Sequence, residues 1–209
     1  MGEAGARPPL LRYPFLWAFL VGVIALTLIR PCLRRIPEPP PVTGRFPAVV
    51  LVDAGGGAVD PATAGGPVFI VLYLRGGCGE PCATALERLR EIQETYAVER
   101  VDGIRLLTVV AEEEPGPTNP KPANPERLRA MAAKMGAVSP RWSFVSGDAA
   151  ALAAVEAALA DGGTTAPPVR LAIVDGGGNL RGTYAAGAAG FNEVYNRARH
   201  VRDAPRSGR

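Results

Sequence analysis

Short apolar runs alternate along this sequence with longer stretches in which apolar residues recur every three or four positions. The short runs are rich in β-branched and aromatic residues and predict strands, whereas the periodic stretches predict amphipathic helices. The predicted strands are 46–52, 68–74, 104–110, 142–145, 169–174 and 180–184, with a short strand after a turn at 53–59. The predicted helices are 125–135, 148–159, 191–199 and an earlier one that starts at the cysteine pair and carries Leu86, Leu89, Ile92 and Tyr96 at helical spacing. Strands that alternate with helices and end in a hairpin plus a helix predict an α/β fold with a central mixed β-sheet flanked by helices.

Two cysteines lie where a predicted strand is followed by a predicted helix. The strand 68–74 ends at a pair of glycines, and Cys78 and Cys82 follow at the start of the helix. A helix N-terminus carries partial positive charge and free N–H groups, which favour a thiolate and lower the pKa of a thiol there. We therefore expect Cys78 to be an exposed, reactive thiol and Cys82, about one turn into the helix, to be a partly buried resolving thiol.

This cysteine spacing permits two kinds of chemistry. Two thiols can form and exchange a disulfide when their Cα atoms lie roughly 4.4–6.8 Å apart, and two thiolates also suit Cu(I). A structural zinc site needs about four ligands, and the chain has three cysteines and one histidine. Two buried structural cysteines, or a merely stabilising disulfide, are the alternative.

The N-terminal part of the chain predicts a membrane anchor. The expected organisation is a disordered tail at 1–12, a transmembrane anchor at 13–30, a proline-rich linker at 31–44, a globular domain at 45–200 and a basic tail at 201–209. The uncharged stretch 13–29 has the length of about 17–25 residues that crosses a bilayer. A cleaved signal peptide is the alternative, but no small-residue cleavage site follows.

The orientation of this anchor does not follow from charge alone, because arginines flank it on both sides. We expect the domain on the periplasmic or extracytoplasmic side, since a dithiol pair on an anchored domain is commonest in an oxidising compartment. The net charge of +3 is too small to indicate nucleic acid binding, and no aromatic and basic stripe supports it. The expected partners are therefore a membrane and other proteins.

The order of elements resembles a thioredoxin fold, and the motifs resemble those of the Sco/SenC family of membrane-anchored proteins. The resemblance covers residues 45–200 and rests on the anchor and its spacer together with Leu72-Tyr-Leu-Arg-Gly-Gly-Cys78-x-x-x-Cys82, Leu106-Leu-Thr-Val-Val110, Pro125-Glu-Arg-Leu128, Trp142-Ser-Phe144 and Ile173-Val-Asp175. It implies a role in building the dinuclear copper site of cytochrome c oxidase, as a copper chaperone or as a thiol reductant of that site. It also implies copper as the metal, Cys78 and Cys82 as ligands, and protein thiols or disulfides, including those of an oxidase subunit, as partners.

The chain lacks the histidine that serves as the third copper ligand of the Sco/SenC family. That histidine is expected near Pro167, and the segment 164–170 contains none. The one histidine of the chain, His200, falls after the last predicted helix, where we expect it to be solvated. The prolines that follow each family cysteine are also replaced, by Gly79 and Ala83.

Pro168 stands close to the position of the missing histidine. Thioredoxins have a cis-proline before the equivalent strand, where it faces the cysteine pair and helps to dock the partner peptide. The resemblance therefore makes Pro168 a candidate catalytic residue beside Cys78 and Cys82, and a pair of loop prolines before a strand is the alternative.

Three functions fit the sequence. The first is a membrane-anchored thiol–disulfide oxidoreductase of the Sco/SenC type, in which Cys78 attacks a partner disulfide and Cys82 resolves the mixed disulfide. The second is a Cu(I) metallochaperone that binds copper through the same two cysteines. The third is a non-catalytic assembly or interaction protein, for which replacing both cysteines by serine would leave the function intact.

Overall fold

The computed structural model describes residues 14–33, 38–63, 65–76, 78–112, 120–160 and 169–204, without the side chains of 30–33. The chain divides into two compact units, one ending at Pro37 and one beginning at Glu38. The tail expected at 1–12 lies outside the described residues.

The first unit contains one helix, α1, over Pro14–Leu33. Its large apolar side chains are exposed, as at Phe15 and Leu26. Within the described residues, no helix combines the length and the apolarity that crossing a bilayer requires. The anchor at 13–30 stays a prediction from the sequence.

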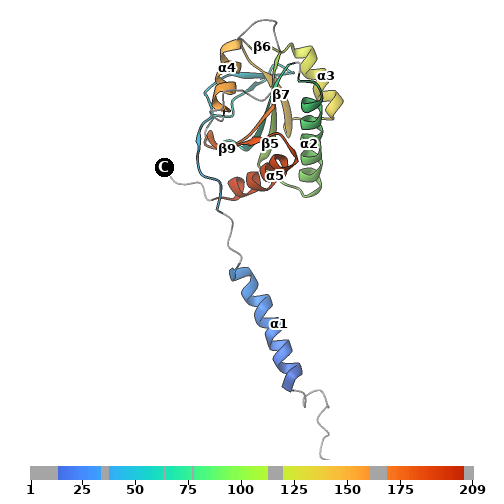
Figure 1. Cartoon of the computed structure of the whole chain (residues 1–209), viewed down its shortest axis with the longest axis vertical. Helices are drawn as coiled ribbons and strands as arrows, with labels where there is room; N and C mark the ends of the chain where they lie inside the picture. Colours follow the sequence, from blue (N-terminus) through green and yellow to red (C-terminus); the bar gives the residue numbers. More distant parts are fainter. Residues whose placement is uncertain are drawn as a thin grey trace, which may run out of the picture. The chain divides into compact units, whose positions relative to one another are not determined.

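The second unit is a β-sheet with helices on both faces (Figure 1). Its strands are β1 (Gly44–Arg45), β2 (Leu51–Asp53), β3 (Ala58–Val59), β4 (Val68–Arg75), β5 (Ile104–Glu112), β6 (Lys121–Pro122), β7 (Trp142–Ser146), β8 (Val169–Val174) and β9 (Asn179–Ala185). Its helices are α2 (Gly79–Val98), α3 (Pro125–Met135), α4 (Ala149–Ala158) and α5 (Ala188–Asp203).

The described strands run in the order β1-β9-β8-β4-β5-β7-β2-β3, and β6 pairs with β5. The central pairs β4–β5 and β5–β7 are parallel, whereas β4–β8 and β8–β9 are antiparallel. The sheet is therefore mixed, as the sequence predicts. The strand β4, which precedes the cysteine pair, lies at its centre, so every side chain from Val68 to Leu74 is buried.

The two faces of β4 belong to two separate apolar cores. Ile70, Leu72 and Leu74 pack with the buried sides of α2, α3 and α5. Phe69 and Val71, on the opposite face, pack with α4. The alternation of side chains along a strand produces this division, and it places the cysteines on the side of α2, α3 and α5.

Three features differ from the predictions by more than one or two residues at the end of an element. The strand expected at 46–52 is wrong in extent, because only Leu51–Asp53 pairs there. The strand β1 pairs with β9 at one edge of the sheet, and β2 pairs with β7 near the other edge. The segment between β1 and β2 therefore crosses the face covered by α4, and Phe46 is buried in the core on that face. The last helix is longer than the expected 191–199 and extends to Asp203. The short strand β6 falls in a stretch expected to be loop.

Candidate functional site

Cys78 and Cys82 form a disulfide at the N-terminus of α2. Cys78 occupies the N-cap position and Cys82 lies in the first turn, with the two Cα atoms 5.7 Å apart. This separation is within the range that a disulfide requires. The first-turn N–H groups of α2 have no intrahelical acceptor, which is the setting that favours a thiolate after reduction.

The turn that carries Cys78 depends on a glycine. Gly79 has φ +52°, in the left-handed region that only glycine adopts at low cost. Proline is fixed near φ −65°, so the proline that follows the first cysteine in the Sco/SenC pattern does not fit this backbone. The backbone conformation therefore explains why glycine and not proline follows the first cysteine.

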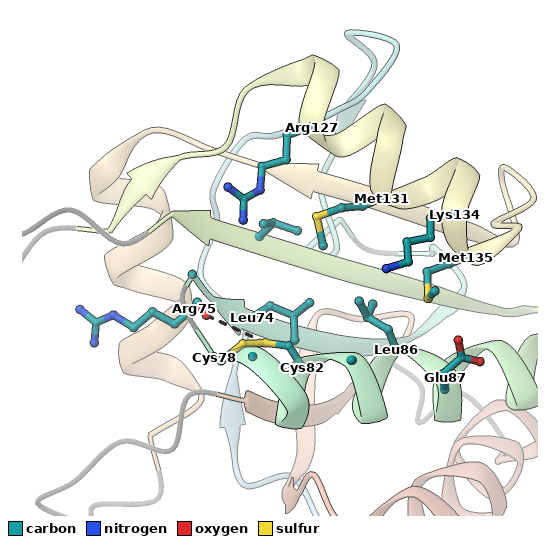
Figure 2. Close-up of a pocket in the computed structure, with 14 residues that line it drawn as sticks. Leu74, Arg75, Cys78, Cys82, Leu86, Glu87, Arg127, Met131, Lys134 and Met135 are labelled. Carbon is teal, nitrogen blue, oxygen red and sulfur yellow. Dashed lines mark hydrogen bonds between the residues drawn. A yellow bond between two sulfur atoms is a disulfide. The ribbon is translucent and has the colours of Figure 1, made fainter.

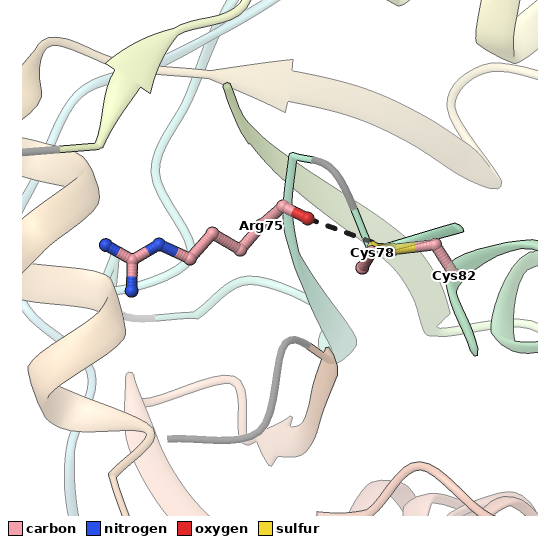
Figure 3. Close-up of a disulfide and its surroundings, with 3 residues drawn as sticks. All are labelled: Arg75, Cys78 and Cys82. Atoms are coloured by element: carbon pink, nitrogen blue, oxygen red, sulfur yellow. Dashed lines mark hydrogen bonds between the residues drawn. A yellow bond between two sulfur atoms is a disulfide. The ribbon is translucent and has the colours of Figure 1, made fainter. Parts of the chain in front are cut away.

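The two cysteines have similar accessibility. Both are partly buried and pack against the core formed with α2, α3 and α5. The structure thus does not show the difference in exposure that the sequence suggested. Cys82 Sγ lies 4.0 Å from the carbonyl oxygen of Arg75 (Figure 3), a weak acceptor for the Cys82 thiol in the reduced protein.

The side chain of Arg75 points away from the disulfide, toward α4 (Figure 3). Its Nη1 atom lies 3.2 Å from Glu156 Oε1, and the hydroxyl of Tyr73 donates to Glu156 Oε2 at 3.2 Å. Burial, followed by the Glu156 carboxylate, raises the pKa of Tyr73 above its usual value. The cation that ends β4 just before the cysteine pair is therefore directed to Glu156 and not to the sulfur atoms.

An open cavity of about 300 Å³ adjoins the disulfide. It lies between α2 and α3, above the ends of β4 and β5 (Figure 2). Its wall includes Leu74, Cys78, Cys82, Ala83, Leu86, Glu87, Val110, Arg127, Met131, Lys134 and Met135. Sequence reasoning predicted α3 but not that its methionines and cations would line a cavity beside the cysteines.

Two other residues were considered from the sequence, Pro168 and His200. Pro168 lies outside the described residues. His200 is in α5, and Arg202, two residues later, donates to the carbonyl oxygen of Asp102 just before β5. The cysteines follow the opposite end of β4, whose eight residues span roughly 26 Å, so His200 lies far from the disulfide. Within the described residues no three His, Cys, Asp or Glu side chains form a group that could hold a metal.

No family model matches the sequence, and no curated protein matches it. Solved structures do resemble it. BsSco, a member of the Sco family of cytochrome c oxidase assembly proteins, matches with TM-score 0.63 and 12% identity over 80% of this chain and 99% of that one. A SCO1/SenC family lipoprotein from Bacillus anthracis str. Ames matches with TM-score 0.56 and 13% identity over 77% and 96%. Bradyrhizobium japonicum ScoI with copper bound matches with TM-score 0.53 and 15% identity over 75% and 99%.

The sheet order, the flanking helices and these likenesses define a thioredoxin-like α/β fold, with a disulfide at the start of its first core helix. The fold is that of the Sco/SenC proteins, which confirms the resemblance drawn from the sequence motifs. The absence of the family's copper-ligand histidine makes the chain divergent from that pattern.

Proposed function

We propose that this chain is a membrane-anchored thiol–disulfide oxidoreductase of the Sco/SenC type that acts in assembly of the copper site of cytochrome c oxidase. The Cys78–Cys82 disulfide, at a helix N-terminus and in the wall of an open cavity, carries the proposal. The similarity to BsSco, a protein with a disulfide switch and a member of a family of oxidase assembly proteins, supports the chemistry and the oxidase subunit as partner.

The exchange reaction proceeds in two steps from the reduced protein. The Cys78 thiolate attacks one sulfur of a partner disulfide, so a Cys78–partner S–S bond forms while the partner's own S–S bond breaks and one partner thiolate leaves. Cys82 then loses its proton and attacks Cys78 Sγ, which releases the second partner thiolate. Two electrons pass from the Cys78–Cys82 dithiol to the partner, and both partner thiolates are protonated from solvent. An external thiol reductant restores the dithiol.

Pro168 and α1 complete the proposal. Pro168 would hold the backbone of the partner segment next to Cys78, as the cis-proline of thioredoxins does, and Pro168→Ala should then slow exchange with protein disulfides more than exchange with a small disulfide. The uncharged sequence stretch 13–29 is the basis for the anchor, and the likeness to a lipoprotein supports membrane attachment. The domain would face the periplasm or another extracytoplasmic space.

A Cu(I)-binding metallochaperone is the second candidate, and the donor set of the cavity favours it. Cys78 and Cys82 supply two soft thiolates, and the thioethers of Met131 and Met135 line the same cavity. Soft thiolates and thioethers select Cu(I), whereas Cu(II) prefers the imidazole that is missing here. Copper would be cargo in this function, and its binding would require the reduced cysteine pair.

Trapping the mixed disulfide tests the oxidoreductase. The full-length chain in mild detergent, with Cys32→Ser to leave only the pair, is reduced and mixed with bis(2-hydroxyethyl) disulfide, and the adducts are measured by mass spectrometry after acid quenching. Cys82→Ser should accumulate a mixed disulfide on Cys78, whereas the intact pair should pass through this adduct to the intramolecular disulfide.

Cys78→Ser is the matched variant, because it keeps Cys82 in the same helix turn. It should form an adduct at least about tenfold more slowly if Cys78 is the attacking thiol. A dithiol that does not exchange in the folded protein would refute the oxidoreductase. Tight binding of one Cu(I) per chain under anaerobic conditions, lost in both serine variants, would then support the chaperone. Neither behaviour would favour a non-catalytic assembly protein.

A further inference from the structure

The cavity between α2 and α3 has a directional layout. The disulfide lies at one end, and Glu87 of α2 and Lys134 of α3 lie toward the other (Figure 2). Between them the wall is apolar, with Leu74, Leu86, Val110, Met131 and Met135. A segment of another protein that brings its cysteine to Cys78 therefore meets an apolar surface first and charged side chains next.

The apolar part of the wall is suited to varied side chains. Of the two methionines that line the cavity, Met131 is partly buried and Met135 is buried. Methionine side chains are unbranched and polarisable, so they adapt to partners of different shape. A volume of about 300 Å³ is at the lower end of ligand pockets, which favours one or two side chains rather than a folded domain.

The charges at the cavity favour an anionic partner group. Arg127 and Lys134 line it on the α3 side, and Glu87 is the one carboxylate residue in the described lining. Glu87 is paired with Arg90, and Arg127 is paired with Glu112. Lys134 makes no ion pair within the part of the chain that the structure describes, so its ammonium group is available to an acidic side chain.

We infer that this cavity selects the partner of the exchange reaction: an extended protein segment that carries, near its reactive cysteine, one large apolar residue and one acidic residue. The inference rests on the proposed function. Lys134 lies toward the same end of the cavity as Glu87 (Figure 2), so the position of Glu87 along α2 gives the approximate distance from the cysteines. From Cys82 to Glu87 the helix rises about 7.5 Å, and from Cys78 about 13.5 Å. An extended chain covers these distances in roughly two to four residues, so the acidic residue lies two to four positions from the partner cysteine, with the apolar residue between them.

A set of peptides tests this inference. Each peptide has one cysteine in a mixed disulfide with thionitrobenzoate. Leucine stands two positions and aspartate four positions from this cysteine, on its N-terminal side in one peptide and on its C-terminal side in another. Comparison peptides replace leucine by serine or aspartate by lysine. Attack of Cys78 on the peptide sulfur releases thionitrobenzoate, and Cys82 then releases the peptide thiol and leaves the intramolecular disulfide. Absorbance of thionitrobenzoate gives the second-order rate constant of this single reaction for the reduced full-length chain carrying Cys32→Ser.

For the chain direction that reacts faster, the leucine–aspartate peptide should react about tenfold faster than the serine peptide. It should also react several-fold faster than the lysine peptide at low salt. Lys134→Glu should reverse the preference between aspartate and lysine. Met131→Gln, with a similar size and a polar end, should reduce the advantage of leucine. Arg129→Glu is the matched control, because Arg129 is an exposed cation of α3 outside the cavity lining, and it should leave both preferences unchanged.

The failures of the two proposals are distinguishable. Bis(2-hydroxyethyl) disulfide has no side chains for the cavity to select, so loss of reaction with it and with all peptides would refute the oxidoreductase itself. Normal reaction with it, but equal rates for all peptides, would refute the selection. Equal effects of Lys134→Glu and Arg129→Glu would also refute it, because they would show a general charge effect rather than docking.

Discussion

Arg75 and Glu156 form an ion pair behind the disulfide, with Arg75 Nη1 3.2 Å from Glu156 Oε1. The backbone of Arg75 faces the sulfur atoms through its carbonyl group, whereas its side chain lies toward α4 (Figure 3). The buried Arg170 also donates to the backbone carbonyl of Glu156, at 3.5 Å. The strand end that presents the disulfide is thus held by polar contacts on the opposite face of the sheet.

Replacing Arg75 by methionine should leave the reactivity of Cys78 in the reduced protein unchanged, because the guanidinium group lies toward Glu156. The lost ion pair is partly exposed and should lower the free energy of unfolding by less than about 1 kcal/mol. The rate of alkylation at neutral pH gives the reactivity, and denaturant unfolding gives the stability. A clear fall in the alkylation rate would mean that the Arg75 charge acts on the sulfur.

Glu156→Gln should be more destabilising, by about 1–3 kcal/mol, since it removes the charged acceptor of Arg75 and of the Tyr73 hydroxyl. The pKa of Tyr73 should fall toward its ordinary value but stay above it, because burial is the largest cause of its rise. Ultraviolet absorbance of tyrosinate as a function of pH measures this. An unchanged tyrosine titration would contradict the assigned contact.

Gly79→Ala should lower the free energy of unfolding by about 1–2 kcal/mol, the cost of placing a side chain in the left-handed region. Gly79→Pro should cost more, because its φ cannot reach a positive value. Gly136 is the matched control, since it has φ +63° at the C-terminus of α3 with no heavy atom near the added Cβ. Gly136→Ala should show a similar loss of stability with unchanged thiol reactivity. A Gly79→Pro variant as stable as the unsubstituted protein would contradict the positive φ at position 79.

Thr108→Val should destabilise the central sheet by about 1–3 kcal/mol. Trp142 Nε1 donates to Thr108 Oγ1 at 2.9 Å, and both residues are buried, so the substitution leaves the indole N–H without an acceptor. Thr95→Val is the control, because Thr95 is exposed on α2 and bonds only its own helix; its effect should stay within about 0.5 kcal/mol. Equal effects in denaturant unfolding would contradict the assigned role of Thr108.

Asp175→Asn should reduce stability in a pH-dependent way. Burial acts to raise the pKa of Asp175, but hydrogen bonds from Asn179, Arg181 and Gly177 outweigh it and hold this pKa below its usual value. The resulting stability is present above the unfolded pKa of about 3.9 and is lost as the pH falls through the folded pKa. The difference from the unsubstituted protein should be largest near neutral pH and should shrink below about pH 4, as measured by unfolding across pH. A difference that is constant with pH would contradict an ionised Asp175.

Local sequence was sufficient for several features. The strand before Cys78 and the helix after it follow from neighbouring residues alone, because burial periodicity and glycine positions act over a few residues. The start of α3 was equally predictable: Asn124 accepts from the N–H groups of Glu126 and Arg127, and Pro125 occupies the first helical position. The strand expected at 46–52 failed because its pairing depends on which edge of the sheet the chain reaches, and local propensity does not encode that.

The sequence by itself determined that two cysteines lie at the junction of a buried strand and a helix in a mixed α/β fold, since these features depend on short-range patterns. Tertiary structure alone decided what surrounds the pair. Packing of α3 beside α2 brings Met131 and Lys134 to the cavity, although they lie about fifty residues from the cysteines in the chain. The alternation of β4 directs Arg75 to Glu156, 81 residues away, because the opposite face of that strand is covered by α4.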